Sequence, residues 1–495
     1  MLLRDVVTSI FESGAELAQY QFFQIIEECP IVADALTQCL HPRFDGDIEL
    51  QNRALFCIRS ALWTTARCAL NIQRSKCLPM LAAFLARCPE EMVREAVLCL
   101  CALPVGNSAT LGERLLAEEY LDHLDALLMG RVRQLKDDLE DALFQALASI
   151  AEFIRDERSA VMAARMAMRA VFSTDSNRSQ HFECGTDAFR HIAHRHAHVV
   201  LESGVLRRLL DLTLECVPNV NRSTMMLLYK LASSGDAARQ ALLVAGASTR
   251  LGVLFRSGFR SQNLMGIGVV YELALGRPSQ VDVLLRSTKL RNGLLRMLGA
   301  ESHEPEVKDA RGRQPNEYDS SKPDPFRLRV QAALALCTML SRCSTRCLLS
   351  MKPMVVLSAI GKSLELGASH YTRDAGLASI ALEATREVLG TYMPEYGVVE
   401  RFGTMEELHE AATGAGVIPG LQTIVDDTVQ VQTSAEATRL MEYFFGGVKD
   451  MDESSDHDGQ WIGSSAAAGA GAGVASAAGA AGAAWGGPTQ FTGFR

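Results

Sequence analysis

Histidine and cysteine residues are concentrated in one short stretch of the chain, and side chains of these types could bind a metal ion. If this stretch is helical, three histidines fall at i, i+3 and i+7 on one helix face, and a His-x-x-Cys pair precedes them. Imidazole and thiolate are ligands that zinc prefers. The spacing matches no strong zinc template, so histidines that hydrogen-bond at a helix end and turn and shield the next unit are the favoured interpretation. A milder functional alternative is a pH-sensitive surface. The candidate ligands are His181, Cys184, His191, His194 and His198, with His196 in the same stretch.

Three later cysteines could form a thiol site. Cys343 and Cys347 share a helix face if their helix continues past Ser341, and Cys337 precedes them. Paired Cys-x-x-Cys spacing is lacking here, which favours buried or half-buried thiols.

The sequence carries no nucleotide-binding or catalytic signature that we recognise. Gly266-Ile267-Gly268 lies in a predicted helix interior and does not follow a strand, so it does not form a phosphate loop. Gly-x-Ser-x-Gly, His-Glu-x-x-His and Walker motifs do not occur. We therefore expect a protein that is not an enzyme and that needs no cofactor or metal.

A repeat organises the helices around these residues. Tyr229-Lys230-Leu231-Ala232 recurs as Tyr271-Glu272-Leu273-Ala274 after 42 residues, and Leu242-Leu243 recurs as Leu284-Leu285 at the same shift. The related segment at Cys337 follows Tyr271 by 66 residues, and the excess equals the length of the polar stretch Ala300 to Pro323. A fixed period near 42 indicates a helical solenoid with one inserted loop.

The segments Val200 to Leu210 and Leu242 to Ala247 resemble the armadillo repeat, in which an apolar pair and a short Gly turn precede a Leu-rich helix. The resemblance implies an all-α, right-handed superhelical solenoid of armadillo- or HEAT-like repeats, with a groove lined by the third helix of each unit. We expect this domain over residues 1–447, with roughly nine units and a mobile insertion at about 300–323. Residues 448–495, acidic and then Ala/Gly-rich, have few side chains that could bury a face, so we expect a disordered tail.

The composition limits which partners and which cellular compartment we expect. The formal net charge of −9 argues against nonspecific binding of nucleic acid or of anionic membranes, which need a concentrated basic face. The thirteen cysteines lie mostly in apolar helical runs, as reduced cysteines of a cytoplasmic or nuclear protein do. The N-terminus resembles no signal peptide, and no apolar stretch is of membrane-spanning type, so we expect a soluble protein.

The groove is the most informative candidate site. In peptide-binding armadillo proteins of the importin-α type, third helices present Trp and Asn four residues apart, and neither occurs at the matching positions here, so recognition of nuclear-import cargo is not supported. Nor does the chain show the unbroken Lys/Arg ladder of β-catenin. The candidate partner-binding positions are Met226, Lys230, Gly268, Glu272 and Thr338.

The resulting functional hypothesis is a non-catalytic scaffold or adaptor that binds a partner protein segment along this groove. The alternatives are a co-chaperone-like platform for a motor or heat-shock ATPase, and a structural component of a cytoskeletal or ciliary assembly.

Overall fold

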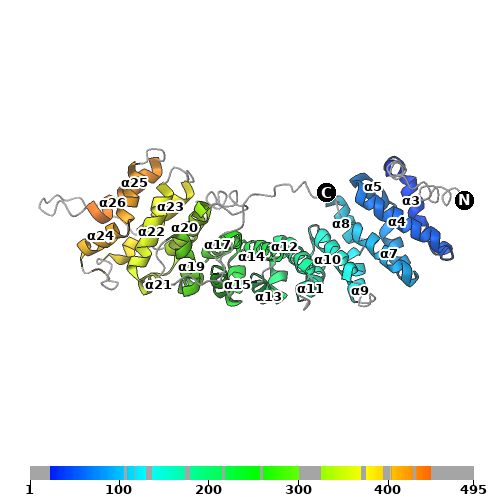
Figure 1. The fold of residues 1–495 in the computed structure, drawn as a ribbon, viewed down its shortest axis with the longest axis horizontal. Helices are drawn as coiled ribbons and strands as arrows, with labels where there is room; N and C mark the ends of the chain where they lie inside the picture. Colours follow the sequence, from blue (N-terminus) through cyan, green and yellow to red (C-terminus); the bar gives the residue numbers. More distant parts are fainter. Residues whose placement is uncertain are drawn as a thin grey trace, which may run out of the picture. The chain divides into compact units, whose positions relative to one another are not determined.

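The computed structural model describes most of the chain as helices (Figure 1). The described residues are 23–104, 109–117, 119–129, 137–172, 179–214, 218–256, 260–299, 325–368, 375–393, 402, 404–426 and 431–446, and they contain no strand. The expected insertion at 300–323 and the expected tail at 448–495 lie outside the described residues. No helix within the described ranges is long and apolar enough to cross a membrane. The chain divides into two compact units, Met1–Arg250 and Leu251–Arg495.

The first unit is built from short and long helices in alternation, and α16 begins in this unit and ends in the second. The helices are α3 (Pro30–Gln38), η1 (Pro42–Phe44), α4 (Ile48–Thr64), α5 (Ala66–Arg74), α6 (Cys77–Leu85), α7 (Glu90–Ala102), α8 (Ala109–Ala117), α9 (Tyr120–Met129), α10 (Asp137–Ala151), α11 (Glu157–Val171), α12 (Ser179–Glu202), α13 (Leu206–Leu212), α14 (Pro218–Ser233), α15 (Asp236–Val244) and α16 (Ala247–Leu254).

The second unit continues the same alternation. Its helices are α17 (Arg260–Ala274), α18 (Pro278–Arg286), α19 (Thr288–Leu298), α20 (Pro325–Arg342), α21 (Thr345–Ser350), α22 (Pro353–Ala368), α23 (Ala375–Tyr392), α24 (Met405–Gly414), α25 (Val417–Asp426) and α26 (Val431–Phe445).

Long helices of successive repeats pack on one another and form the core. In the first unit α4, α7, α10, α12 and α14 each pack against the next, and we call them the third-helix layer. In the second unit α17 packs on α20, α20 on α23 and α23 on α26. The predicted apolar stripe of Leu143, Leu147, Ile150 and Ile154 is confirmed, because all four side chains are buried. A repeat cannot bury its apolar faces alone, so the stacked repeats share one core within each unit.

Basic side chains join several repeats to the one before. A guanidinium or ammonium group from one repeat donates a hydrogen bond to a backbone carbonyl at the C-terminal end of a helix in the preceding repeat. Those carbonyls have no partner within their own helix, and the helix dipole places partial negative charge there, so a cation is stabilising. The pairs are Arg87 with Leu40, Arg169 with Leu128 and Arg208 with Val171 in the first unit, and Arg296 with Phe255 and Lys362 with Gly299 in the second.

A tight turn precedes the second helix of several repeats, and its last residue adopts a left-handed conformation. Gly246 before α16 (φ +98°) and Gly416 before α25 (φ +80°) occupy it without steric cost. Lys76 before α6 and Glu119 before α9 occupy the same place with φ +61°. The side chain of each therefore strains the backbone, because Cβ approaches the carbonyl oxygen in this conformation.

We expect Lys76→Gly and Glu119→Gly each to raise the free energy of unfolding by about 0.5–1 kcal/mol. The left-handed conformation costs a non-glycine residue about 1–2 kcal/mol, and the greater freedom of glycine in the unfolded chain takes back about 0.5–1 kcal/mol. Urea denaturation followed by circular dichroism measures the change. The matched control is Gly246→Ala, which we expect to lower stability; a loss of stability on introducing either glycine would contradict the turn assignment.

Candidate functional site

The histidine stretch lies on α12, and its members contact different helices of the first unit. His181 is buried, with Nε2 2.7 Å from Asp141 Oδ1 on α10 and its ring edge-on to Phe144. His198 is exposed, and its Nε2 lies 3.2 Å from Glu157 Oε1 on α11. His196 has non-helical dihedral angles (φ −128°, ψ 50°) and breaks α12 there. The break places His198 beyond the helix face that His191 and His194 share.

The electrostatics of this stretch do not favour metal binding. Burial raises the pKa of the Cys184 thiol to about 12, and neighbouring acids including Asp187 add to the rise. A thiol binds zinc as thiolate, so a raised pKa weakens it as a ligand. Burial, followed by the nearby Arg190 charge, lowers the pKa of His191. Within the described ranges no three or more His, Cys, Asp or Glu side chains are grouped as a metal site.

The three later cysteines are thiols in a packed environment. Burial raises the pKa of Cys337 and of Cys343 to about 12, and it also raises the pKa of Cys347. α20 ends at Arg342, and Ser344 accepts a hydrogen bond from the Cys347 N–H to begin a new helix, α21. Cys343 and Cys347 therefore do not share one continuous helix face.

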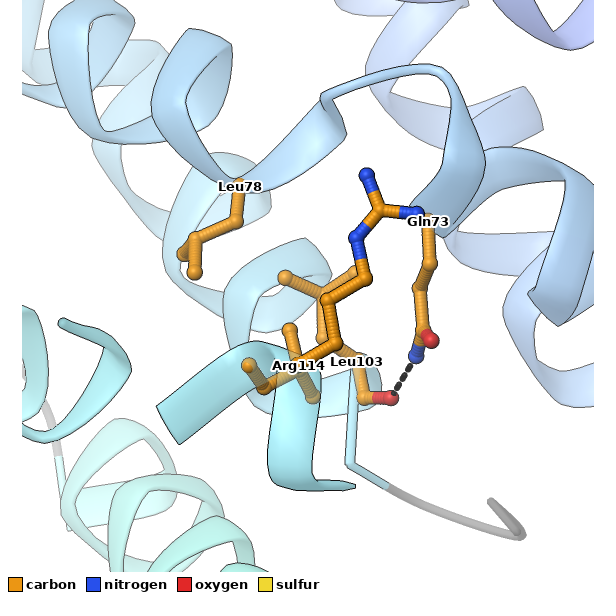
Figure 2. Close-up of a pocket in the computed structure, with 5 residues that line it drawn as sticks. Gln73, Leu78, Leu103 and Arg114 are labelled. Atoms are coloured by element: carbon orange, nitrogen blue, oxygen red, sulfur yellow. Dashed lines mark hydrogen bonds between the residues drawn. The ribbon is translucent and has the colours of Figure 1, made fainter. Parts of the chain in front are cut away.

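One hollow in the first unit lies between α5, α6 and α8 (Figure 2). Gln73 Nε2 donates a hydrogen bond of 2.5 Å to the Leu103 carbonyl across it, while Gln73 Oε1 is buried and has no hydrogen-bond partner among the described residues. The hollow has no room for a water molecule. It is a packing gap between repeats, and we assign it no ligand. Its lining residues are Gln73, Leu78, Leu103, Arg114 and Leu115.

The structure separates the five predicted groove positions by burial. Met226 and Lys230 lie on α14 in the first unit, where Met226 is 42% exposed and Lys230 is half-buried. The other three lie in the second unit and are buried: Gly268 and Glu272 on α17, and Thr338 on α20, with Glu272 8% and Thr338 3% exposed. These three are therefore not on an exposed groove face.

A physical reason for this burial is visible in the two helices. Residues 266–274 of α17 and 331–340 of α20 are buried throughout. Both segments are apolar or small on nearly every side, and a helix without a polar face packs inside a protein core. The matching part of α14 keeps an exposed face, because Met226 and Ser233 are exposed there.

Sequence reasoning gave little weight to the aromatic face of α4. Phe56 and Trp63 fall at i and i+7 on this helix and are 37% and 57% exposed. Arg59, between them, places its guanidinium carbon 5.6 Å from the Phe56 ring centre and pairs with Glu95 on α7 at 2.6 Å. The helical spacing of the two aromatics was the available signal.

Comparisons with known proteins bear on the fold. No family model matches the chain, and no curated protein matches it. An engineered protein of known structure is 17% identical, with a TM-score of 0.62 over 89% of this chain and 94% of that one. A structure concerning the phosphorylation switch that controls the interaction between cadherin and beta-catenin is 13% identical, with a TM-score of 0.56 over 89% and 86%. A designed armadillo repeat protein in complex with a (KR)4 peptide is 16% identical, with a TM-score of 0.43 over 48% and 98%.

Proposed function

Since the chain has the armadillo-like helical-repeat fold, we propose that it is a non-catalytic scaffold that binds a segment of a partner protein on the third-helix layer of its first unit. The observation that carries this proposal is the exposure of Phe56, Trp63 and Met226 on that layer. Phe56 and Trp63 lie together on one face of α4, and grouped exposed apolar side chains are typical of interaction surfaces. The proposed occupant is an extended segment or a helix that crosses the layer, whose helices pack side by side from α4 to α14.

Each exposed side chain has a distinct part in this proposal. Trp63 supplies a large, rigid anchor, and Trp is enriched among the residues that dominate binding energy. Met226 is unbranched and adapts its shape to a partner side chain. Lys230 fixes register by pairing with a partner carboxylate, which gives specificity more than affinity. Arg59 is paired with Glu95 and holds the Phe56 ring from one side.

The test is co-purification of the full chain with its partners from native cells, read by quantitative mass spectrometry. We expect the double variant Trp63→Ser and Met226→Ser to lose a dominant partner by at least about tenfold, because loss of one anchor costs about 2 kcal/mol or more. Both side chains are exposed, so we expect an unchanged circular dichroism spectrum.

The matched control is Val161→Ser, which removes an exposed apolar side chain of α11, outside the third-helix layer. We expect this variant to retain every partner. Retention of all partners by the double variant, or equal losses in the control, would contradict the proposed surface.

A further inference from the structure

Positive charge is concentrated in one part of the second unit, although the whole chain is acidic. Residues 273–299 and 325–364 together contain eleven Lys and Arg and a single acid, Asp282. The formal net charge of the chain is −9, so this concentration is local. Like charges gathered in this way repel one another and attract anionic partners.

A buried carboxylate joins the helices that carry this charge. Asp282 on α18 accepts hydrogen bonds from the Ser344 N–H at 2.9 Å and from the Ser344 hydroxyl at 2.7 Å, which fixes α18 against the start of α21. Arg286 Nη2 lies 3.7 Å from Asp282 Oδ2. The Asp282 carboxylate is largely buried and pairs with Arg286, so it offsets part of that one charge, and Glu387 of α23 also lies near Cys343. The other cations of these two ranges outnumber both acids.

Further hydrogen bonds bring more guanidinium groups to the same junction. Arg342 Nη1 donates to the Leu275 carbonyl at 3.2 Å, and Arg291 Nη1 donates to the Leu285 carbonyl at 3.2 Å. Burial and then Asp282 raise the pKa of Cys347, while Arg286 and Arg291 act in the opposite direction, so both cations lie near α21. We call this set the basic surface, and its members are Arg277, Arg286, Arg291, Arg342 and Arg346.

The exposed part of the basic surface combines charge with an apolar contact. Arg277, Arg286 and Arg346 are exposed, and Arg291 and Arg342 are half-buried. Val283 is also exposed, three residues before Arg286 on the same side of α18. These helices differ from the third-helix layer of the first unit, so the surface is separate from the one proposed above.

We propose that the basic surface binds an acidic, extended segment of a partner protein, whose carboxylates pair with Arg286 and Arg346 and whose apolar side chain packs on Val283. The planar guanidinium group matches a carboxylate with two parallel hydrogen bonds, which favours arginine over lysine at such a surface. Residues 273–299 and 327–364 contain no aromatic side chain. Proteins that bind single-stranded nucleic acid stack bases on aromatic residues, so the composition favours a protein segment.

The test is fluorescence anisotropy of a labelled synthetic peptide of alternating Glu and Leu, titrated with the full chain. We expect saturable binding that weakens as salt is added, since exposed charge pairs are screened. Arg286→Glu combined with Arg346→Glu should weaken binding by at least about tenfold, because like charges then face each other. Both side chains are exposed, and circular dichroism checks that the variant remains folded.

The control is Arg439→Glu, which reverses one charge at an exposed position of α26 where the basic-surface variant reverses two, and it should leave the affinity unchanged. The double variant Trp63→Ser and Met226→Ser should also bind the peptide normally, so failure of one surface is distinguishable from failure of the other. Affinity of the basic-surface variant equal to that of the parent chain would overturn the proposal.

Two further measurements test the identity of the occupant. The first measures binding of oligouridylate. If oligouridylate binds more tightly than the peptide, and the basic-surface variant loses this binding, the occupant is nucleic acid and the proposal of a protein segment is overturned. Neutralising Asp450, Asp452 and Glu453 in the full chain tests its own acidic stretch as a competitor. If peptide affinity rises about tenfold or more on this change, the chain's own acidic stretch occupies the basic surface, and the proposal of a partner segment is overturned.

Discussion

Replacing Phe255 by alanine is expected to lower the free energy of unfolding by about 3–5 kcal/mol, the range for deleting a buried aromatic side chain. Phe255 follows α16 and is fully buried. Two glycines of neighbouring helices make room for it. A Cβ added at Gly266 would lie 2.8 Å from Phe255 Cε1, and one added at Gly293 would lie 2.7 Å from Phe255 Cβ. Urea denaturation followed by circular dichroism measures the loss, with hydrogen exchange of α17 and α19 locating it in the second unit.

A double-mutant cycle tests the fit between the ring and the glycine. Gly266→Ala alone should cost about 1–3 kcal/mol by overpacking. In a Phe255→Leu background the ring is absent, so the added methyl should cost less, with a coupling energy of about 0.5–3 kcal/mol. Gly414→Ala is the control, because a Cβ there meets no atom within 4 Å. Additive losses at Phe255 and Gly266 would contradict the packing described here.

The repeat architecture could be predicted because its signal is local. The shared Tyr, Leu and Ala of α14 and α17 recur after 42 residues, and the structure places both segments in long helices that pack within their repeats. Most contacts in a helical repeat protein join neighbours in sequence, so a short segment already contains most of what specifies its fold. The all-α armadillo-like fold is accordingly confirmed.

The exposure of the polar positions was harder to predict. The repeat period shows which residues occupy matching positions, but it does not show whether their side chains are exposed. Lys230 and Glu272 occupy the same place in two repeats, yet Lys230 is half-buried and Glu272 is buried. The difference lies in what surrounds each helix. The small and apolar residues on all sides of Gly268 were the available indication, because a helix of that kind is packed on every face.

The candidate chemistry depended on contacts that sequence spacing could not show. His181 and His198 had the spacing of metal ligands, but their partners, Asp141 and Glu157, are about forty residues away on other helices. The net charge did not predict the basic surface either, because a chain with a formal net charge of −9 contains this group of arginines around Asp282. The net charge does not show how charged residues are distributed in space. Packing of the repeats brings residues together that are distant in sequence, such as Asp282 and Ser344.

Asp282→Ala is expected to lower the free energy of unfolding by about 1.5–3 kcal/mol, the range for hydrogen bonds to a charged group. The substitution removes the acceptor for the Ser344 N–H and hydroxyl. Ser344 in turn accepts from the Cys347 N–H, so its side chain would cap α21 without support from α18. Asp282→Asn keeps one carbonyl acceptor, and we expect it to lose less stability than the alanine variant.

The matched control is Asp211→Ala, which breaks the pair between Asp211 and Arg250 at 2.6 Å in the first unit. These side chains are 38% and 41% exposed, so solvent screens the pair and this loss should be about 0–1 kcal/mol. Each variant removes one negative charge, and the comparison therefore isolates burial and hydrogen bonding from net charge. Equal effects at Asp211 and Asp282 would mean that the contact with Ser344 does not hold α18 to α21. A larger effect at Asp282, with faster hydrogen exchange in α21, would locate the loss at this junction.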